Sequence, residues 1–384
     1  MKTAGIIAEY NPFHSGHAYH IARTRELGYT HICVVMSENA VQRGDIAILD
    51  AHSRAKAAIA GGADLVIGLM PPYSIGSAHD FASAGVSILA GLGAIDALSF
   101  GAETDDIGAL CRCAWYLEKI DKDELKGLMS AGLTYPQALT KALNRLGDGF
   151  GEILSTPNNV LALEYIRAIN GSGMTPIAIK RTAAHDGLTP ICGYASASYL
   201  RKIMLSGGDV GGFMGYDYDE KDVSGMERIE GAILWRLTLA SPEEILSAPY
   251  TGGGIGQRII KNAMTARSLG ELFEAAKTRN VTHARVRRAV LAITLGMTAE
   301  DIQSPPYARV LAANARGLEI LAECKRHASI PVSTSLADLS KISEHAQRCA
   351  ELSDMASRLR FLARADVKSE VYVSEMARKA LIIK

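Results

Sequence analysis

Short apolar runs alternate with amphipathic stretches over the first hundred positions of the chain. The apolar runs predict buried strands at Thr3–Ala8, His31–Met36, Asp64–Gly68 and Ile95–Phe100. The stretches between them predict helices at Gly16–Leu27, Ser53–Ala60 and Ala78–Leu92, with Ser53 as the N-cap of the second helix. Strands that recur with helices between them indicate an α/β fold, a parallel sheet with crossover helices covering both faces.

The second half of the chain has a different pattern. Pro176–Lys180 predicts one more strand and Ser198–Leu205 one more helix, and a glycine-rich stretch follows. We place a domain boundary there, dividing residues 1–210 from residues 211–384. Beyond it the pattern predicts a mainly α-helical domain, with helices at Val223–Leu239, Ile255–Arg267, Gly270–Lys277, His283–Leu295, Tyr307–Ala328 and Leu336–Arg364.

Composition excludes several classes of protein. The chain has 384 residues, 48% hydrophobic and 21% charged, which is typical of globular domains. No apolar run approaches the ~20 residues needed to span a bilayer, and the first apolar stretch contains Glu9, unlike a signal peptide. The six cysteines form no C-x-x-C pair, which favours reduced, buried thiols over disulfides or a zinc site: Cys33, Cys111, Cys113, Cys192, Cys324 and Cys349. We expect a soluble, cytoplasmic protein.

Charge is balanced over the whole chain but not along it. The chain has 41 basic and 41 acidic residues, whereas Ser241–Lys384 has 21 basic and 15 acidic residues, a net charge of +6. No acid occurs between Glu274 and Glu300, where five cations gather: Lys277, Arg279, Arg285, Arg287 and Arg288. Such a patch suits a nucleic-acid backbone. The alternative is a helix face that is solvated or packed between domains.

The most informative segment is His14-x-Gly16-His17, which follows the first predicted strand and opens the first predicted helix. Ligands of open α/β sheets bind beyond the carboxyl ends of the strands, and a helix N-terminus attracts phosphate. Gly16 lets the backbone approach a phosphate, and two imidazoles donate hydrogen bonds to its oxygens during transfer. His20 lies one turn later and either extends this face or is structural.

The residues around this motif carry a resemblance to a known family. Ile6-Ile7-Ala8-Glu9-Tyr10-Asn11-Pro12-Phe13-His14-x-Gly16-His17 resembles the H-x-G-H nucleotidylyltransferases and, more narrowly, the bacterial tRNA(Met) cytidine acetate ligases. Later segments are similar to the same family: Val41–Gly44, Ser99–Glu103, Pro157–Asn159, Lys180-Arg181, His185-Asp186, Ala195–Ser198, Val281–Arg288 and Pro305–Leu311. This chain has Ser37-Glu38-Asn39-Ala40 where the family has Ser-Gly-Asn-Phe, and its stretch before His185 is shorter.

The resemblance implies a Rossmann-like nucleotidylyltransferase domain and a two-step reaction. ATP and acetate would form acetyl-adenylate and pyrophosphate, and the wobble cytidine of elongator tRNA(Met) would then be acetylated to N4-acetylcytidine. The first step needs in-line attack on the α-phosphate, which is mostly positioning and charge stabilisation. His14 and His17 are the candidate catalytic residues. Mg²⁺ would bridge the triphosphate without a dedicated protein metal cage, and we expect no stable protein partner.

The resemblance also implies an ATP-binding set: Ile7, Ala8, Glu9, Tyr10, Asn11, Pro12, Phe13, His14, Gly16, His17, His20, Gly101, Asn158, Asn159, Arg181, Ser196 and Ser198. Several members have structural alternatives. Asn11 and Gly101 suit turns, Arg181 suits a surface ion pair, and Ser196 or Ser198 suits a helix cap. One of Asn158 and Asn159 is expected to be an N-cap, and the sequence does not decide which of the two reaches ATP. Ser196, Ser198 and Arg201 also resemble a phosphate loop of related adenylyltransferases. The five cations from Lys277 to Arg288 are the candidate tRNA-binding residues, and Gln42, Arg43 and Asp50 are candidates for the acetate or cytidine pocket.

Two other functions are consistent with parts of this pattern. One is a small-molecule adenylyltransferase of coenzyme biosynthesis, and the basic helical extension argues against it. The other is an RNA-binding protein with a vestigial nucleotide site, and the intact His14, Gly16 and His17 argue against that.

Overall fold

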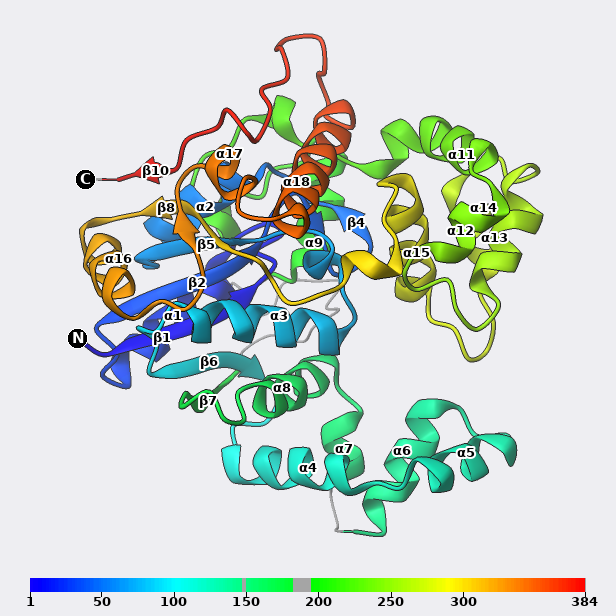
Figure 1. Cartoon of the computed structure of the whole chain (residues 1–384), viewed down its shortest axis with the longest axis horizontal. Helices are drawn as coiled ribbons and strands as arrows, with labels where there is room; N and C mark the ends of the chain where they lie inside the picture. The colour runs from blue at the N-terminus through cyan, green and yellow to red at the C-terminus, as the bar shows by residue number, and fades with distance from the viewer. Residues whose placement is uncertain (147–149, 182–194, 384) are drawn as a thin grey trace.

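The computed structural model describes residues 1–146, 150–181 and 195–383, which are built around an eight-stranded sheet (Figure 1). The strand order is β10-β8-β5-β2-β1-β6-β7, with β9 beside β8. The strands are β1 (Thr3–Ala8), β2 (His31–Ser37), β5 (Leu65–Leu69), β6 (Ala97–Ala102), β7 (Thr175–Lys180), β8 (Ala308–Ala313), β9 (Val332–Ser333) and β10 (Leu381–Ile382). All pairings are parallel except β5 with β8. A separate short hairpin joins β3 (Ala40–Val41) and β4 (Asp45–Ile46).

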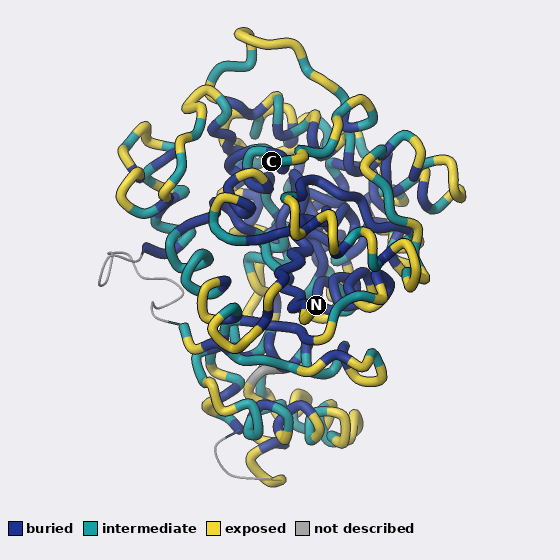
Figure 2. Tube along the Cα trace, turned by 90° about the vertical axis from the view of Figure 1, so that its left-hand side faces the viewer, coloured by how far each residue is buried: buried dark blue, intermediate teal, exposed yellow. Residues whose placement is uncertain are grey.

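The two faces of the sheet are covered by different helices, which confirms the predicted class. Ile7 of β1 and Val35 of β2 pack into one cluster with α3 (Ala78–Gly91) and α16 (Ala315–His327). Their neighbours Ile6 and Val34 pack into a second cluster with α1 (Ser15–Glu26) and α2 (Ala51–Ala60). Because successive side chains of a strand point to opposite faces, near-continuous apolar strands require cover on both sides. The dark blue core in Figure 2 contains these strands.

The order of the strands creates a crevice beside β1. The chain runs from β1 outward to β2 and β5, then returns to the other side of β1 to form β6 and β7. Open α/β sheets bind ligands at such a switch point, outside the carboxyl ends of the strands. Here that position lies between the ends of β1 and β6.

Helix boundaries near this edge follow from local capping. Helix α2 begins two residues earlier than predicted, because the Asp50 carboxylate accepts hydrogen bonds from the backbone N–H groups of His52 and Ser53 at 2.8 and 3.2 Å. The prediction that Ser53 is the N-cap was therefore wrong. Asp50 takes the N-cap position instead of Ser53 because its carboxylate accepts hydrogen bonds from two backbone N–H groups at once.

The helical connection between β6 and β7 was not predicted, apart from the helix that Asn158 or Asn159 was expected to cap. It comprises α4 (Ile107–Lys119), α5 (Lys122–Ser130), α6 (Tyr135–Asn144), α7 (Phe150–Leu154) and α8 (Pro157–Ala168). Helix α8 packs on α3 and β6, whereas α5 and α6 extend away from the sheet (Figure 1). The carboxyl end of β6 and the start of α8 are thereby brought to the crevice.

The chain after residue 195 is mainly helical, as predicted, with α9 (Ala197–Leu205) beside the crevice. The other helices are α10 (Gly211–Met214), α11 (Glu230–Leu239), α12 (Pro242–Ser247), α13 (Ile255–Ala263), α14 (Leu269–Ala276), α15 (His283–Thr294), α17 (Leu336–Leu339) and α18 (Glu344–Leu362). Short 3-10 helices in this part of the chain are η2 (Glu220–Asp222), η3 (Met226–Ile229) and η4 (Ala299–Asp301), and η1 (Tyr73–Ile75) lies earlier, after β5. Helices α11 to α15 form their own apolar cluster to one side of the sheet (Figure 1).

Three helix predictions in this region were wrong in part. The helix predicted at Leu336–Arg364 is two helices, α17 and α18, because the Ser343 side chain caps a new helix start. Residues Tyr307–Ala328 are a strand followed by a helix, because Asn314 ends β8 and caps α16 by accepting a hydrogen bond from Gly317 N at 3.0 Å. The alanine-rich run before Asn314 has no glycine or proline to mark the change. Residues 223–229 precede α11 and include η3. The α-helix therefore occupies only the second half of the range predicted at Val223–Leu239.

The C-terminal segment is held to the sheet by buried charges. Arg309 of β8 is 1% exposed and lies 2.7 Å from a carboxylate oxygen of Glu375 and 3.5 Å from one of Glu38. The Ser357 hydroxyl donates a further hydrogen bond to Glu375 at 2.9 Å. Strand β10 then completes the sheet edge beside β8. The C-terminal half therefore contributes strands to the same sheet as the N-terminal half.

Two further findings concern predictions made from composition. Cys33, Cys113, Cys324 and Cys349 are free and buried, and Cys111 is free and half-buried. Cys192 and the His185-Asp186 segment lie outside the described residues. None of the described helices combines the length and the apolar character needed to cross a membrane.

Replacing Arg309 by Met should lower the free energy of unfolding by about 3–5 kcal/mol, because Glu38 and Glu375 would stay buried without their counter-charge. Urea unfolding followed by circular dichroism measures this change. Arg326→Met is the matched control, since Arg326 makes only an exposed i,i+3 pair with Glu323, and its midpoint should not move. Equal urea midpoints for the two variants would contradict the view that Arg309 neutralises the buried carboxylates of Glu38 and Glu375.

Candidate active site

A cavity of about 670 Å³ lies at the carboxyl ends of β1, β6 and β7. Its wall is completed by the first residues of α1, α8 and α9, so three helix N-termini face it. Helix N-termini carry unpaired N–H groups and the positive end of the helix dipole. The position and the surrounding dipoles both suit an anionic ligand.

His14 and His17 form the polar centre of this cavity. His14 is the N-cap of α1, and its Nδ1 accepts a hydrogen bond from Gly16 N at 3.1 Å. His17 reciprocates, because its Nδ1 accepts from His14 N at 3.2 Å. The two rings stack with their centroids 3.8 Å apart. Since both Nδ1 atoms act as acceptors, each neutral ring carries its proton on Nε2, which remains to donate to a ligand.

Gly16 is required by the His14 ring. A Cβ atom at this position would lie 3.0 Å from His14 Cε1 and 3.1 Å from His14 Nδ1. A side chain there would crowd the ring that caps the helix. The glycine therefore lets His14 fold back onto the helix start, in addition to the close approach to phosphate predicted from the sequence.

Burial keeps both imidazoles neutral. Burial, followed by the nearby positive charges of Arg181 and Arg201, lowers the pKa of His14 to about 3. Burial, His14 and Arg181 together lower the pKa of His17 well below its usual value. A neutral donor pair is then maintained far below physiological pH.

His20 is held by a chain of hydroxyl groups. The Thr24 hydroxyl donates a hydrogen bond to His20 O at 2.9 Å. Because its proton is used there, the Thr24 oxygen accepts a hydrogen bond from the Ser99 hydroxyl at 2.8 Å. Ser99 Oγ in turn lies 2.9 Å from His20 Nε2 and accepts a hydrogen bond from its N–H group. Burial, and then the charge of Arg181, lower the pKa of His20 to about 4. His20 lines the cavity with its Nε2 already used by Ser99 of β6.

The turn after β1 is fixed by polar contacts from behind. Tyr10 has a φ of +45°, which is uncommon for a residue with a side chain. Asn11 Oδ1 accepts from Ile48 N at 2.7 Å, and Asn11 O accepts from the Arg201 guanidinium at 2.7 Å. Asn11 lines the cavity, and its buried Nδ2 has no hydrogen-bond partner among the described residues. A buried donor without a partner is rare in proteins and suits a ligand oxygen.

The structure separates the roles of Asn158 and Asn159. Asn159 is buried, and its Oδ1 accepts from the backbone of Glu103 and Thr104 at 2.9 and 3.3 Å. Asn158 lines the cavity and donates to the Glu103 carboxylate at 2.6 Å. Neither is the N-cap of α8, which is Thr156, so that prediction was wrong.

Glu103 explains this arrangement. Its second carboxylate oxygen accepts from Asn159 N at 2.9 Å, so an acidic side chain from the end of β6 does the capping. Burial alone would raise the pKa of Glu103, but hydrogen bonds from Asn158, Thr156 and Asn159 outweigh it and lower the pKa. The β6 turn and the start of α8 are thus fixed to each other.

Arg181 follows β7 and supplies a half-buried positive charge. Its side chain passes over Gly101, where an added Cβ would lie 3.4 Å from Arg181 Cγ. Arg181 Nε has no partner among the described residues, as for Asn11 Nδ2. Burial and the nearby Arg43 lower the pKa of Arg181, whereas Glu103 opposes the shift. Both Gly101 and Arg181 line the cavity, so the alternative of a surface ion pair for Arg181 is not what the structure shows.

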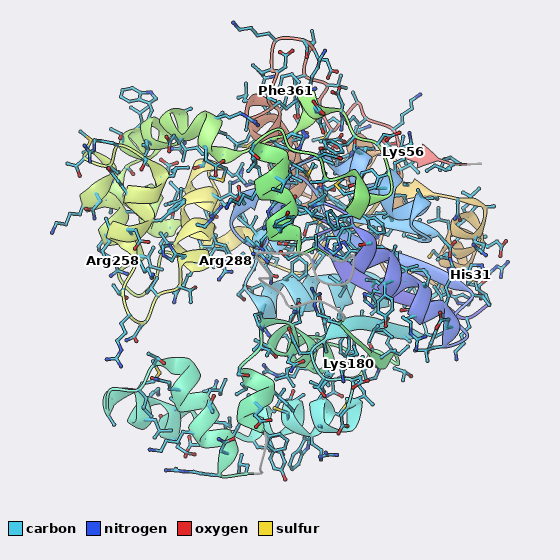
Figure 3. All side chains as sticks on the ribbon, turned by 180° about the vertical axis from the view of Figure 1, so that it is seen from behind. His31, Lys56, Lys180, Arg258, Arg288 and Phe361 are labelled. Atoms are coloured by element: carbon cyan, nitrogen blue, oxygen red, sulfur yellow. The ribbon has the colours of Figure 1, made fainter. Side chains whose placement is uncertain are left out.

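The helical region closes the cavity from the side of α15. Thr282, Ala284 and Arg288 line it, together with Gln42 and Arg43 from the β3–β4 hairpin. In Figure 3, Arg288 lies where α15 meets the sheet region, and Lys180 marks the end of β7. Arg288 packs on the Tyr250 ring, with its guanidinium carbon 5.5 Å from the ring centre.

Arg287, next to Arg288, pairs with Asp45 of the same hairpin. An added Cβ at Gly44 would lie 2.3 Å from Arg288 N, so the hairpin and α15 are in direct backbone contact. Two of the five predicted tRNA-binding cations therefore join the two regions. Lys277 and Arg279 are exposed, and Arg285 donates to Gly252 O at 3.1 Å.

Most of the predicted ATP-binding residues come together. Those that line the cavity are Ile7, Ala8, Glu9, Tyr10, Asn11, His14, Gly16, His17, His20, Gly101, Asn158, Arg181 and Ser196. Those outside its lining are Pro12, Phe13, Asn159 and Ser198. Phe13 packs in the core, where its ring occupies the space beside Gly61. Ser198 accepts hydrogen bonds from Arg43 and Arg201, and Ser196 caps α9.

An apolar wall of the cavity was missed by sequence reasoning. Phe81 of α3, Phe100 of β6, and Val160, Leu161 and Tyr165 of α8 line it. An apolar wall with a few polar groups is typical of a site for a planar base. These residues carry no local signal, because in the sequence they look like any other core positions.

The unusual Glu38 lies away from the cavity lining. It is buried against Gly68, where a Cβ would lie 2.4 Å from its carboxylate, and it pairs with Arg309. Ala40 is likewise buried. Asp50 caps α2 and pairs with Arg378 at 3.0 Å rather than lining the cavity.

Comparison with known proteins places this site in a family. Residues 1–372 match the HIGH Nucleotidyl Transferase family. The tRNA(Met) cytidine acetate ligase of Acetivibrio thermocellus is 33% identical, with 89% of this chain and 90% of the relative covered. The tRNA(Met) cytidine acetate ligase of Syntrophotalea carbinolica is 34% identical, with 88% and 85% covered. The chain belongs to this ligase family.

The fold of the ligase family is also found here. The crystal structure of Thermotoga maritima TmcAL bound with alpha-thio ATP matches this structure with a TM-score of 0.90. The match covers 100% of both chains at 24% sequence identity. The family match and the two relatives confirm the resemblance inferred from residues 6–17, and the matching crystal structure confirms the mixed α/β class.

His14 and His17 should keep a neutral, Nε2-protonated ring from pH 8 down to pH 5. Two-dimensional ¹H–¹⁵N NMR of the imidazoles, assigned with His14→Gln and His17→Gln, measures the tautomer and the titration. The urea-unfolded chain is the control and should titrate near 6.5. The unfolded state gains protons at a higher pH than the folded state, so the free energy of unfolding should fall as pH falls from about 6.5 towards 3. A folded-state midpoint near 6.5 would refute this assignment.

Proposed function

We propose that this chain activates acetate with ATP and acetylates the wobble cytidine of elongator tRNA(Met). One observation carries the proposal: His14 and His17, whose Nδ1 atoms are used by the helix cap, share a cavity with the half-buried Arg181. The relatives from A. thermocellus and S. carbinolica, named for this activity, support the substrates. The T. maritima structure, described as bound with alpha-thio ATP, supports the nucleotide.

In the first step an acetate oxygen attacks the α-phosphorus of ATP. A new O–P bond forms, the bond between the α-phosphorus and the bridging oxygen breaks, and pyrophosphate leaves. His14 and His17 donate hydrogen bonds to phosphate oxygens as their charge increases, and Arg181 adds positive charge. Because the donors are fixed by the helix cap before substrate binds, little reorganisation is needed during the reaction.

In the second step the exocyclic amine of cytidine attacks the acetyl carbon, and AMP leaves. One wall of the cavity is formed by Arg43 of the β3–β4 hairpin with Thr282 and Arg288 of the helical region. A base splayed from an RNA loop would enter the cavity beside this wall. The exposed Lys277 and Arg279 would then contact the RNA backbone.

Mg²⁺ fits the donor set of this cavity. The described residues contain no group of three potential metal-ligating side chains. Glu9 lines the cavity, and its Oε1 is buried without a hydrogen-bond partner among the described residues. Mg²⁺ bound through substrate phosphates typically uses one or two carboxylates and retains several waters. Glu9 would hold the ion, which would neutralise charge on the triphosphate.

The other two functions receive less support. A small-molecule adenylyltransferase has no need for α15 as a wall of the cavity. A vestigial nucleotide site would not require the reciprocal cap that leaves Nε2 of both cavity-lining histidines free of the helix start.

Exchange of labelled pyrophosphate into ATP tests the first step directly. We expect exchange that depends on acetate and needs no tRNA, followed by transfer of labelled acetate to tRNA(Met). Exchange that occurs only with tRNA would show that RNA completes the site. No exchange under either condition would refute adenylate formation.

His17→Asn should lower this exchange by about 10²–10³-fold, the cost of one lost oxyanion donor. The Asn carboxamide oxygen can replace Nδ1 as acceptor for His14 N but provides nothing at the Nε2 position. Its binding of tRNA, measured by filter retention, should equal that of the wild type. Unchanged exchange would remove His17 from the mechanism.

Charge reversal at Lys277 and Arg279 should weaken tRNA binding and spare the exchange reaction. The slope of log K against log salt should fall by about 1 for each RNA phosphate that the two side chains no longer neutralise. Lys325→Glu on α16 is the control, because this exposed lysine lies on the far side of the sheet from α14 (Figure 1). If the double reversal and the control bind tRNA equally, the basic segment does not bind the RNA.

A further inference from the structure

Arg54 of α2 is a buried cation with an unusual set of partners. Its side chain is 0% exposed, and its guanidinium donates to four backbone carbonyls. Nη1 donates to Glu9 O at 2.7 Å and to Ser37 O at 2.9 Å, and Nε donates to Leu49 O at 2.9 Å. Nη2 donates to Glu38 O. In the described part of the chain no carboxylate lies within ion-pair distance of it.

These carbonyls mark one edge of the sheet. Glu9 follows the last residue of β1, Ser37 is the last residue of β2, and Glu38 comes next. Parallel strands all direct their carboxyl ends to the same edge, which here faces the cavity. Unpaired carbonyl oxygens at this edge would be costly to bury and would repel a triphosphate.

Arg54 also sets the conformation of the turn that carries His14 and His17. Arg54 donates a hydrogen bond to the Glu9 carbonyl, and Arg201 donates one to the Asn11 carbonyl. The two guanidiniums therefore fix the backbone on either side of Tyr10. Tyr10 lies between them with its φ of +45°. A side-chain-bearing residue keeps such a φ only where its surroundings enforce it. Tyr10 in turn packs against His17, with ring centres 4.6 Å apart.

We propose that Arg54 is a positioning residue for adenylate formation: its guanidinium turns the Glu9 carbonyl away from the cavity and thereby aims the histidine pair at the phosphates. The inference rests on the proposed function. Arg54 does not line the cavity, so it acts through the Glu9–Asn11 turn. Burial lowers the pKa of Arg54 to about 10, so it remains charged at neutral pH.

A merely structural role for Arg54 makes a different prediction. If the guanidinium only stabilised the fold, its loss would reduce the amount of folded protein and leave kcat per folded molecule unchanged. Arg309 provides the matched case, because it is equally buried, at 1% exposure, but its partners are Glu38 and Glu375. Neither of these carboxylates lines the cavity.

The experiment compares Arg54→Met, Arg54→Lys and Arg309→Met at a temperature where circular dichroism shows each to be folded. Acetate-dependent pyrophosphate exchange gives kcat and the KM for acetate, and imidazole NMR gives the state of His14 and His17. We expect kcat per folded molecule to fall about 10²-fold in Arg54→Met. Arg54→Lys, which cannot span all four carbonyls, should fall about 10-fold, and the KM for acetate should change little. The Nε2–H signals of both histidines should shift in the Arg54 variants and stay in place in Arg309→Met.

The outcomes separate this inference from the proposed function. Wild-type kcat per folded molecule in Arg54→Lys, or histidine signals unchanged in either Arg54 variant, would overturn the inference. A loss of kcat in Arg309→Met as large as in Arg54→Met would overturn it as well. If the wild type shows no exchange, the proposed function fails, and the histidine signals alone then decide whether Arg54 positions the pair.

Discussion

The reciprocal cap at the start of α1 is the constraint on which the site depends. Each of His14 and His17 has two ring nitrogens, and the helix start uses Nδ1 of both. A nitrogen that accepts a backbone N–H cannot be protonated, so the proton must lie on Nε2, and burial prevents a second proton from binding. Folding the helix and fixing the proton of both rings on Nε2 are therefore one event. This is why the histidine spacing suits both a capping box and phosphoryl chemistry.

The balance of charge around the cavity follows from the same arrangement. Neutral histidines add donors without adding repulsion, so the positive charge of the lining comes from Lys180 and three arginines, Arg43, Arg181 and Arg288. Arg43 lies 4.0 Å from the Glu9 carboxylate, and Arg201 donates to Asn11 O. The buried donors without partners, on Arg181 and Asn11, are a cost that an anionic ligand removes. The site is thus better satisfied with a phosphate bound than without one.

Local signals allowed much of this to be predicted from the sequence, and non-local contacts set the limit. The strand at Thr3–Ala8 and the motif after it were found because apolar runs and helix starts are encoded over a few residues. The capping of α8 by Glu103 was missed because the acid comes from the end of β6, some fifty positions earlier. Strand β8 was taken for helix because its pairing with β5 lies more than two hundred positions away. Asp50 was chosen for the substrate pocket although its carboxylate caps α2, a local feature that could have been recognised.

Two buried arginines near the end of β2 show why burial alone does not define a role. Arg309 neutralises two carboxylates. Its removal would leave two unpaired negative charges in the core and so lower the free energy of unfolding. Arg54 neutralises no side chain, and its partners are carbonyl dipoles at the edge where ligand would lie. A charge kept in the core for dipoles alone is expensive unless those dipoles must point in one direction. The direction of the Glu9 carbonyl decides where Tyr10, and through it His17, is placed. The cost of burying Arg54 therefore makes sense as the cost of holding one turn in a conformation that it would not otherwise keep.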